Sequence, residues 1–370
     1  LPAVGRWCVM ELEIFTQDRD NQWKFISEKV FDGFKSLTVK LNYYTYSTFE
    51  LFVGLTPENI QIFVPDTVIY MEGLYFYVDA VVVDDQATAQ IKVSGKSLLG
   101  KSLDRIVYRI YNKTAPPEQI VWEHLNNEVV NPSDVKRKIQ YLKLDSRANL
   151  GNTSIQYQNS YGVVAEEVET LCTSYDFGIR ETATKLGVPG NTLSIFKGRD
   201  VSRTIEFSDE YENLTKAGYQ NNNFDESSTA IVFGEGEGSE RKSVVVGNEK
   251  TGLQRKELYV DARDLQKTTD EVTLTDSQYL EVLKNRGNNK LSERKRILTL
   301  SGEVPTSSKL FKLGEDYQLG DTITIKSNLY NLKKTSTITT IKKTYDSKGL
   351  FIEPIFGKET PTIFDVLGRE

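Results

Sequence analysis

The first hundred residues form a series of short apolar stretches separated by turn residues, and this pattern limits the fold more than any other feature. Residues 7–15 are apolar at first and then alternate at Leu12 and Ile14. Residues 17–21 are polar and typical of a turn, and the next apolar stretch starts at Trp23. Because strand side chains point alternately to two faces, this arrangement predicts a β-hairpin.

The same spacing continues to residue 94. Stretches rich in Val, Ile, Leu, Phe and Tyr predict further strands at residues 36–41, 48–53, 68–71, 74–83 and 88–94. Glu72 and Gly73 lie between two of these stretches and predict a tight turn. Short strands at this spacing are typical of a barrel or a sandwich.

The middle of the chain carries helical patterns. A short helix is predicted at residues 97–103, and Pro116-Pro117 opens a longer one at 118–130, since proline fits the first turn of a helix. Residues 161–175 have apolar side chains at helical spacing, and Gly178 is the predicted stop.

Strand patterns dominate the remainder. They lie at residues 105–111, 191–196, 203–207, 243–246, 256–260, 297–300, 321–326, 336–345 and 350–354. A third helix is inserted among them, because Thr275 and Gln278 have the spacing of a capping box, although Gly287 is expected to interrupt it. The predicted fold class is α+β, mainly β, with several domains, because 370 residues exceed one ordinary core.

Charge and cysteine content exclude several classes of protein. The net charge is −6, and an acidic chain does not wrap phosphates by default. No apolar run approaches the ~18–20 residues of a spanning helix, so no stable membrane insertion is expected. Two cysteines, Cys8 and Cys172, are too few for a disulfide scaffold, and Cys172 lies in a helical pattern typical of a small core residue.

Residues that usually carry chemistry are few. His124 is the only histidine, so it cannot build a multi-histidine metal site, and a partly buried or surface position on its helix is expected. The turn Gly234-Glu235-Gly236-Glu237-Gly238 lacks the lysine and hydroxyl of a P-loop and is predicted to be a mobile acidic loop. Ser94-Gly95-Lys96-Ser97 lacks the earlier glycine of that motif.

Clusters of charge suggest two other kinds of site. Asp84-Asp85 and the group Glu315, Asp316 and Asp321 surround predicted turns; solvated turns are expected, with a cation between loops or subunits as the alternative. The basic segment 290–296 is interpreted as a solvated helix end rather than a nucleic-acid site. The sequence therefore predicts no catalytic, cofactor-binding or metal-binding residues.

Four segments resemble, in the same order, the hub or tail-associated (Tal-like) proteins of siphophage tail tips. They are residues 91–106 (IKVSGKSLLGKSLDRI), 196–214, 252–264 and 317–325. That family is related in fold to the central hub of contractile phage baseplates. The resemblance implies two related antiparallel β-barrel domains of the tube type, with helical insertions.

The resemblance also divides the chain. Residues 1–112 are expected to form the N-terminal barrel, and 113–198 with about 262–295 an α+β insertion domain. Residues 199–261 with about 296–357 are expected to form the second barrel, followed by a C-terminal tail at 358–370.

A structural, non-enzymatic function without cofactors is implied by the same resemblance. Three chains are expected to form a ring at the distal end of the virion tail that closes or gates the tube and lets DNA pass on infection. The expected neighbours are the hexameric ring of the distal tail protein, the tape measure protein and receptor-binding proteins. DNA is expected only in transit, along a lumen to which the acidic segment 201–240 contributes.

Two alternatives remain open at this point. A tail-associated cell-wall hydrolase needs a nucleophile or metal site, and the sequence offers none. A host-glycan-binding adhesin needs exposed aromatic side chains, and Tyr43-Tyr44-Thr45-Tyr46 is the one strong candidate.

Overall fold

A computed structural model describes residues 10–18, 24–83, 89–185, 189–211, 213–269, 273–304 and 310–357. Cys8, Asp84-Asp85 and the tail 358–370 lie outside these residues, so the predictions made for them stay predictions. The fold is mainly β, as expected. Among the described helices, none is long and apolar enough to span a membrane.

The N-terminal half is built from strands and one short helix, and the predicted strands are confirmed. They are β1 (Leu12–Asp18), β2 (Lys24–Phe31), β3 (Phe34–Asn42), β4 (Thr48–Gly54), β5 (Val68–Met71), β6 (Leu74–Val82) and β7 (Gln90–Ser97). Glu72 and Gly73 both have positive φ, as the tight turn between β5 and β6 requires. Helix α1 (Pro57–Ile62), capped by the Thr56 hydroxyl, was not predicted.

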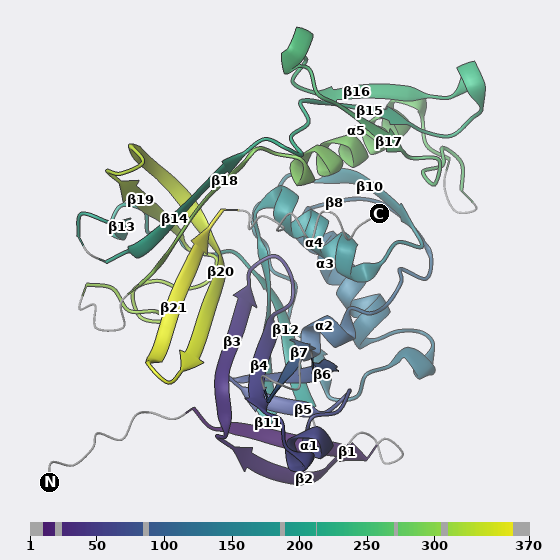
Figure 1. The fold of residues 1–370 in the computed structure, drawn as a ribbon. Helices are drawn as coiled ribbons and strands as arrows, with labels where there is room; N and C mark the ends of the chain where they lie inside the picture. Colours follow the sequence, from purple (N-terminus) through teal and green to yellow (C-terminus); the bar gives the residue numbers. More distant parts are fainter. Residues whose placement is uncertain are drawn as a thin grey trace, which may run out of the picture.

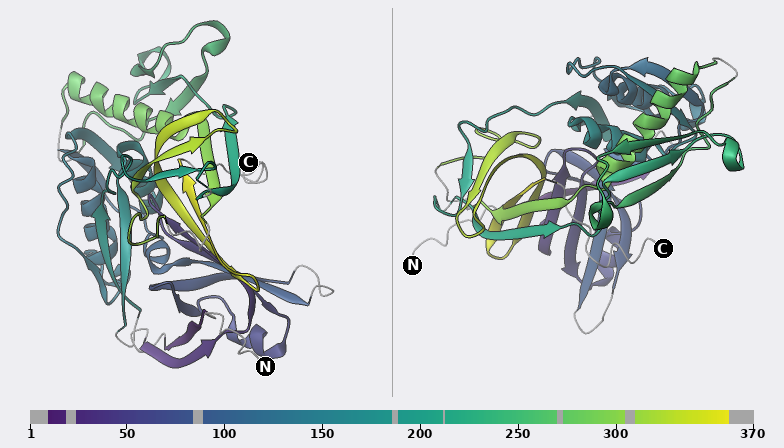
Figure 2. Two further views of the ribbon diagram at one scale, coloured as in Figure 1. Left: turned by 90° about the vertical axis from the view of Figure 1, so that its left-hand side faces the viewer. Right: turned by 90° about the horizontal axis from the view of Figure 1, so that it is seen from above.

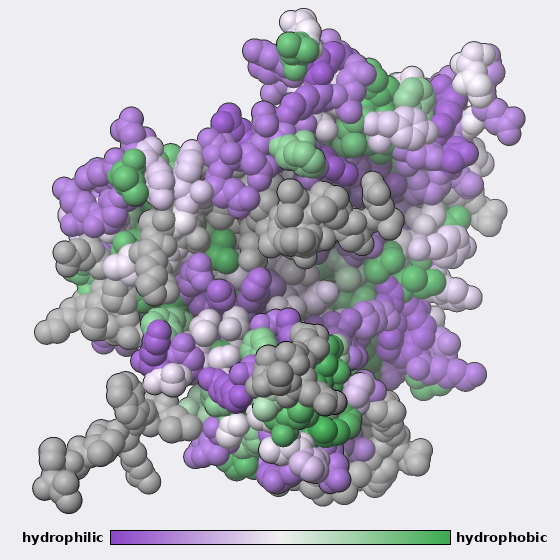
Figure 3. Space-filling model, in the orientation of Figure 1, coloured by the Kyte–Doolittle hydropathy of each residue, from purple (hydrophilic) through white to green (hydrophobic). Residues whose placement is uncertain are grey.

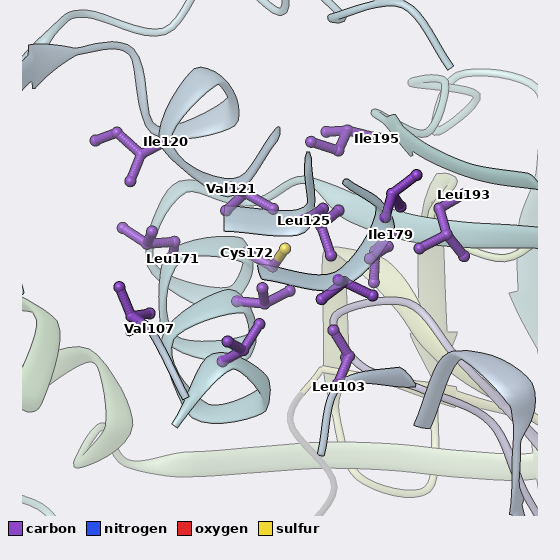
Figure 4. Packing of buried hydrophobic residues seen from close by; sticks show 14 of the residues in the cluster. Leu103, Val107, Ile120, Val121, Leu125, Leu171, Cys172, Ile179, Leu193 and Ile195 are labelled. Atoms are coloured by element: carbon purple, nitrogen blue, oxygen red, sulfur yellow. The ribbon is translucent and has the colours of Figure 1, made fainter. Parts of the chain in front are cut away.

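The middle region packs helices against two small sheets around the core shown in Figure 4. Its elements are α2 (Leu98–Ser102), β8 (Ile110–Ala115), α3 (Pro117–His124), a π-helical turn (Leu125–Val130), β9 (Leu142–Leu144), β10 (Ile155–Ser160), α4 (Val164–Tyr175), β11 (Gly178–Lys185) and β12 (Pro189–Phe196). The strand predicted at 105–111 was wrong, because β8 begins only at Ile110. The predicted stop at Gly178 was also wrong: Asp176, with φ 53°, caps α4, and Gly178 already belongs to β11.

The C-terminal half contains β13 (Glu206–Ser208), β14 (Thr215–Asn222), β18 (Ile297–Glu303), β19 (Thr322–Ser327), β20 (Leu332–Asp346) and β21 (Gly349–Phe356). Between β14 and β18 lies a separate module of β15 (Thr229–Phe233), β16 (Ser243–Gly247), β17 (Glu257–Asp261) and α5 (Asp276–Glu293), at the top of Figure 1.

Helix α5 begins as predicted but is longer and unbroken. Its capping box is present, with the Thr275 hydroxyl accepting from the Gln278 backbone nitrogen at 3.2 Å. Gly287 does not interrupt it. A Cβ at Gly287 would lie 2.6 Å from Val232 and from Val246, so the glycine lets the helix approach the sheet.

Five strands of each half pair in the same order. The ladders β3-β4-β7-β6-β5 and β14-β18-β21-β20-β19 are antiparallel throughout, and their strands follow one another in the same sequence along the chain. The flanking strands differ, since β1 is antiparallel to β5 whereas β13 is parallel to β19. A ladder between β3 and β20 joins both halves into one sheet (Figures 1 and 2). The described strands form no closed barrel.

A side chain completes the free edge of β13. The Asn213 amide oxygen accepts from the Ser208 nitrogen at 2.8 Å, and its amide nitrogen donates to the Glu206 carbonyl at 2.9 Å. Asn213 is almost fully buried. It therefore takes the place of a neighbouring strand where the backbone ladder stops.

Replacing Asn213 with alanine is expected to lower the free energy of unfolding by about 2 kcal/mol, because two buried backbone groups lose their partners. Urea unfolding measures this loss. Asn248, whose side chain is exposed, provides the control, and its replacement by alanine is expected to change stability by less than about 0.5 kcal/mol. Equal unfolding midpoints for the two variants would contradict the role assigned to Asn213.

Candidate functional site

His124 lies at the end of α3 and is completely buried, so the expected partly buried or surface position was wrong. Its ring packs against Tyr111 and Tyr157, with centroid distances of 4.8 and 6.0 Å. Neither ring nitrogen has a hydrogen-bond partner among the described residues. Burial, and secondarily the charge of Arg109, lower the pKa of His124 to about 3. The imidazole is therefore neutral and serves as a packing group.

Two further candidates also belong to the packing of the fold. Cys172 is buried in the core of α3 and α4, as expected, and burial raises the pKa of its thiol. Ser94-Gly95-Lys96-Ser97 lies within β7, where a Cβ on Gly95 would stand 1.8 Å from the Tyr77 carbonyl oxygen. Gly95 thus permits a close strand contact and is not part of a phosphate loop.

The acidic segment 201–240 is divided between two parts of the fold. It runs from β13 in the C-terminal half to β15 in the α5 module. Several of its carboxylates form ion pairs within the chain: Glu206 with Lys333, Glu210 with Lys326, Asp225 with Arg294 and Glu226 with Lys256. The turn at its end is held by Arg241, whose guanidinium donates to the carbonyl oxygens of Phe233 and Gly234.

Tyr43 connects three parts of the chain at the end of β3. Its backbone nitrogen donates to the Thr339 carbonyl at 2.9 Å, and its carbonyl accepts from the Ile179 nitrogen at 3.1 Å. Its hydroxyl accepts from the Gly198 nitrogen at 3.2 Å. Only 1% of Tyr43 is exposed, so this aromatic side chain is a structural contact and cannot stack on a glycan.

Two glycines let the main chain cross beside the Tyr43 ring. A Cβ on Gly198 would stand 1.9 Å from the Gly320 carbonyl oxygen. Gly320 has φ +88°, and a Cβ there would lie 2.4 Å from the ring of Tyr43. The motif segments that begin at Phe196 and Tyr317 therefore meet at this point, although they are far apart in the sequence.

An ion pair fixes the same crossing. The Asp321 carboxylate is completely buried and accepts from the Arg199 backbone nitrogen at 2.8 Å, the Gln318 nitrogen at 3.1 Å and Arg199 Nη2 at 2.6 Å. The expected solvated turn was therefore wrong for Asp321. Among the described residues, no group of three or more His, Cys, Asp and Glu side chains is placed to hold a metal ion.

Replacing Asp321 with alanine is expected to cost about 2 to 3 kcal/mol of unfolding free energy, because buried backbone donors lose their acceptor. Asp321→Asn keeps one carbonyl acceptor and is expected to cost about half as much. Chemical denaturation of both variants measures the difference. Equal stability of Asp321→Ala and the unchanged chain would contradict this role.

The buried carboxyl group of Glu181 links the first motif segment, residues 91–106, to the region around Tyr43, which we call the Tyr43 junction. Glu181 Oε2 accepts from the Leu99 nitrogen at 2.9 Å and from Asn191 Nδ2 at 2.7 Å. Burial raises the pKa of Glu181 to about 7, against the opposing effect of its hydrogen bonds. This side chain thus ties the start of α2 to β11 and β12.

A cavity of about 230 Å³ lies at the junction, lined among others by Leu41, Thr45, Arg180, Phe196 and Gln318. Its carboxylates are engaged in structural contacts: Glu181 as above, and Glu72 in an ion pair with Lys343 at 2.5 Å. No nucleophile and base are paired among its lining residues, so the arrangement holds three parts of the chain together rather than supporting acyl or phosphoryl transfer.

Sequence reasoning marked the motif segments but missed their contacts. Arg199 and Asp321 are 122 positions apart, and no local pattern relates them. The one usable signal was glycine beside charge, as Gly198-Arg199 and Gly320-Asp321. The Glu181 contact left no signal, because an isolated carboxylate in a strand pattern is ordinarily exposed.

Comparison with protein families identifies the family of this chain. The model of the Siphovirus ReqiPepy6 Gp37-like protein family matches residues 11–358. Comparison with curated proteins found no match.

Several solved structures share the fold. A tail protein from Neisseria meningitidis MC58 has a TM-score of 0.53 at 11% identity, covering 94% of this chain and 97% of that one. The 43 kDa tail protein of prophage MuSo2 from Shewanella oneidensis has a TM-score of 0.51 at 13% identity, covering 94% and 98%. Prophage tail protein gp18 from Listeria monocytogenes EGD-e has a TM-score of 0.50 at 12% identity, covering 97% and 98%.

Proposed function

Since this chain belongs to the Siphovirus ReqiPepy6 Gp37-like family, and is thus a structural tail protein of a siphovirus and not an enzyme, we propose that it is the hub of the tail tip. In this proposal three chains form a ring that closes or gates the distal end of the tail tube. The observation that carries the proposal is the shared strand order of the two halves.

Because the chain contains two similar halves, a ring of three chains can match neighbours that have sixfold symmetry. Three chains with two similar halves present six similar units, which is the number needed opposite a hexameric ring. Head-to-tail contacts close into a ring when their rotation allows it. We further propose that each half is a barrel-type domain, that residues 113–198 with about 262–295 form the insertion domain, and that 358–370 is a tail.

The proposed partners follow from a position at the distal end of the virion tail. The hexameric ring of the distal tail protein lies above the hub, the tape measure protein inside, and receptor-binding proteins at the periphery. DNA passes only after the ring opens. These partners remain part of the proposal.

The test is the mass of the purified chain in solution, by light scattering, alone and with the distal tail protein. The expected mass is that of three chains of 42.0 kDa. Electron microscopy of the mixture is expected to show a ring on the sixfold neighbour. A chain that stays monomeric and never joins that ring would overturn the proposal.

The acidic lumen makes a separate prediction. Charge reversal of Glu235 and Glu237 to lysine is expected to slow DNA ejection, because cations at the lumen retain phosphates that carboxylates repel. Ejection kinetics from purified particles, followed by dye binding to released DNA, measure the effect at low and high salt. Glu249→Lys, an exposed carboxylate outside the acidic segment, is the control. Unchanged kinetics in the double variant would remove this segment from the lumen.

A further inference from the structure

We call a strand pair that connects two halves a joint. The chain contains one joint whose two strands are paired, the filled joint, and one equivalent set of two strands that are not paired with each other, the unfilled joint. Within the chain, β3 of the N-terminal half pairs with β20 of the C-terminal half. In the shared strand order, β14 occupies the place of β3, and β6 occupies the place of β20. Among the described strands, β14 and β6 are not paired with each other.

The equivalence of β6 and β20 extends to individual hydrogen bonds. Each strand has a register shift at the same point, between Val78 and Ala80 and between Ile338 and Thr340. The residue before each shift exchanges two backbone hydrogen bonds with the segment entering the neighbouring strand. These are Asp66 N to Val78 O and Val78 N to Thr67 O in one half, and Gly320 N to Ile338 O and Ile338 N to Asp321 O in the other.

The entering residues also share an unusual backbone conformation. Asp66 has φ 70° and Gly320 has φ 88°. Positive φ is uncommon for residues other than glycine, so its presence at both positions supports one backbone path for the two segments. Ala80 of β6 therefore corresponds to Thr340 of β20.

The ladders then fix the position of β14. Val78 pairs with Gly95 and Ile338 pairs with Phe356, so Gly95 corresponds to Phe356. On the next strand of each ladder, Phe49 corresponds to Leu300. On the strand after that, Val39 of β3 corresponds to Tyr219 of β14. Three residues further along β3 and β14 lie Asn42 and Asn222. Asn42 is the residue opposite Thr340 in the filled joint.

Both unfilled sides expose apolar side chains. On β14 and just beyond it, Tyr219 is 39% and Phe224 is 82% exposed. At the end of β6, Val82 is 41% and Val83 is 40% exposed. Figure 3 shows hydrophobic surface low on this face, over the N-terminal strands. Apolar groups gathered beside an open ladder are typical of a contact surface.

We propose that β14 of one chain pairs antiparallel with the end of β6 of a second copy. Asn222 then lies opposite Ala80, and Gln220 lies opposite Val82, as Asn42 and Lys40 lie opposite Thr340 and Lys342 within one chain. The inference deepens the proposed ring and rests on it. In this arrangement, every contact between neighbouring halves is the same antiparallel strand pair, whether it lies within one chain or between two chains.

Cysteine pairs test this register. In a Cys8→Ser background, a chain with Ala80→Cys is mixed with a chain carrying Asn222→Cys and mildly oxidised. Directly opposed residues in antiparallel strands lie about 4.5–5.5 Å apart at Cα, within disulfide range. The matched control is Ala80→Cys with Gln220→Cys, whose positions are diagonal and about 7–8 Å apart. Asn42→Cys with Thr340→Cys in one chain shows that the probe reacts at the filled joint.

The expected result is at least tenfold more covalent dimer from the opposed pair than from the diagonal pair. Light scattering of the same unoxidised mixture separates the two proposals. Oligomers without preferential cross-linking of the opposed pair would overturn this joint and leave the ring standing. Monomers without cross-linking would overturn both the joint and the ring.

Discussion

Replacing Gly198 with valine is expected to lower the free energy of unfolding by more than about 3 kcal/mol, the upper end of overpacking costs. A Cβ at this position would stand 1.9 Å from the Gly320 carbonyl oxygen and 2.6 Å from the Asp321 nitrogen. These obstacles are main-chain atoms, which cannot rotate away as a side-chain end does. Relief requires the chain to separate at the Tyr43 junction, with loss of the contacts on Arg199.

Gly54→Ala is the matched control, because a Cβ at Gly54 meets nothing within 4 Å. Its unfolding free energy is expected to stay within about 1 kcal/mol of the unchanged chain. Thermal and urea unfolding compare the variants, and near-ultraviolet circular dichroism reports tyrosine packing. A Gly198→Val chain as stable as Gly54→Ala would show that the crossing is not tightly packed.

The second large effect concerns pH. The folded state holds His124 neutral down to about pH 3, whereas the unfolded chain protonates this imidazole near its ordinary value of 6.5. Between these pH values the unfolded state binds more protons, so stability falls as pH is lowered, by about 1.4 kcal/mol per unit. Over the whole interval the expected loss is roughly 4 to 5 kcal/mol.

Glu181 opposes this trend over part of the range. Its pKa is about 7 in the fold and 4.5 ordinarily, so the folded state binds the extra proton between these values. That contribution is full below pH 4.5 and disappears as pH rises through 7. The unchanged chain is therefore expected to show little net slope from these two groups above pH 4.5 and a steep loss below it.

Two variants that do not titrate isolate the histidine. His124→Phe keeps an aromatic ring between Tyr111 and Tyr157, and His124→Gln keeps a polar group there. Stability relative to the unchanged chain is measured by urea unfolding at intervals from pH 3.5 to 8. For each variant, the free energy of unfolding relative to the unchanged chain is expected to rise as pH falls below 6.5. Differences that are constant with pH would show that His124 is hydrated or charged in the fold.

Periodicity was sufficient where one face of an element is buried and the other is not. Strands β3 to β7 and α4 follow their patterns within a few residues, because alternation or helical spacing records burial directly. The capping box of α5 marked its start for the same local reason. The tail-protein family was predicted from the four ordered segments, and the family match confirms it.

Contacts between distant segments set the remaining features. Gly178 was predicted to stop a helix. Its lack of a side chain instead leaves room for the ring of Tyr43, which lies 2.2 Å from the position that a Cβ would take. Gly287 was predicted to interrupt a helix. Its lack of a side chain instead lets α5 pack closely against β15 and β16. His124 resembled a surface residue because its turn is helical, yet neighbours from β8 and β10 cover it. None of these partners is visible in a local window.

The ladder between β3 and β20 has a consequence for how the chain reaches its native state. The side chains of Thr38 and Thr344, which meet across it, are 306 positions apart. Contacts of such separation form slowly, because a long loop must close before they add stability. During synthesis the N-terminal strands emerge first, so β3 can pair with β4 while its other edge stays unpaired until residues 340–346 appear. A truncated or stalled product would present that edge to other chains, so the growing protein stays exposed to aggregation until β20 has paired with β3.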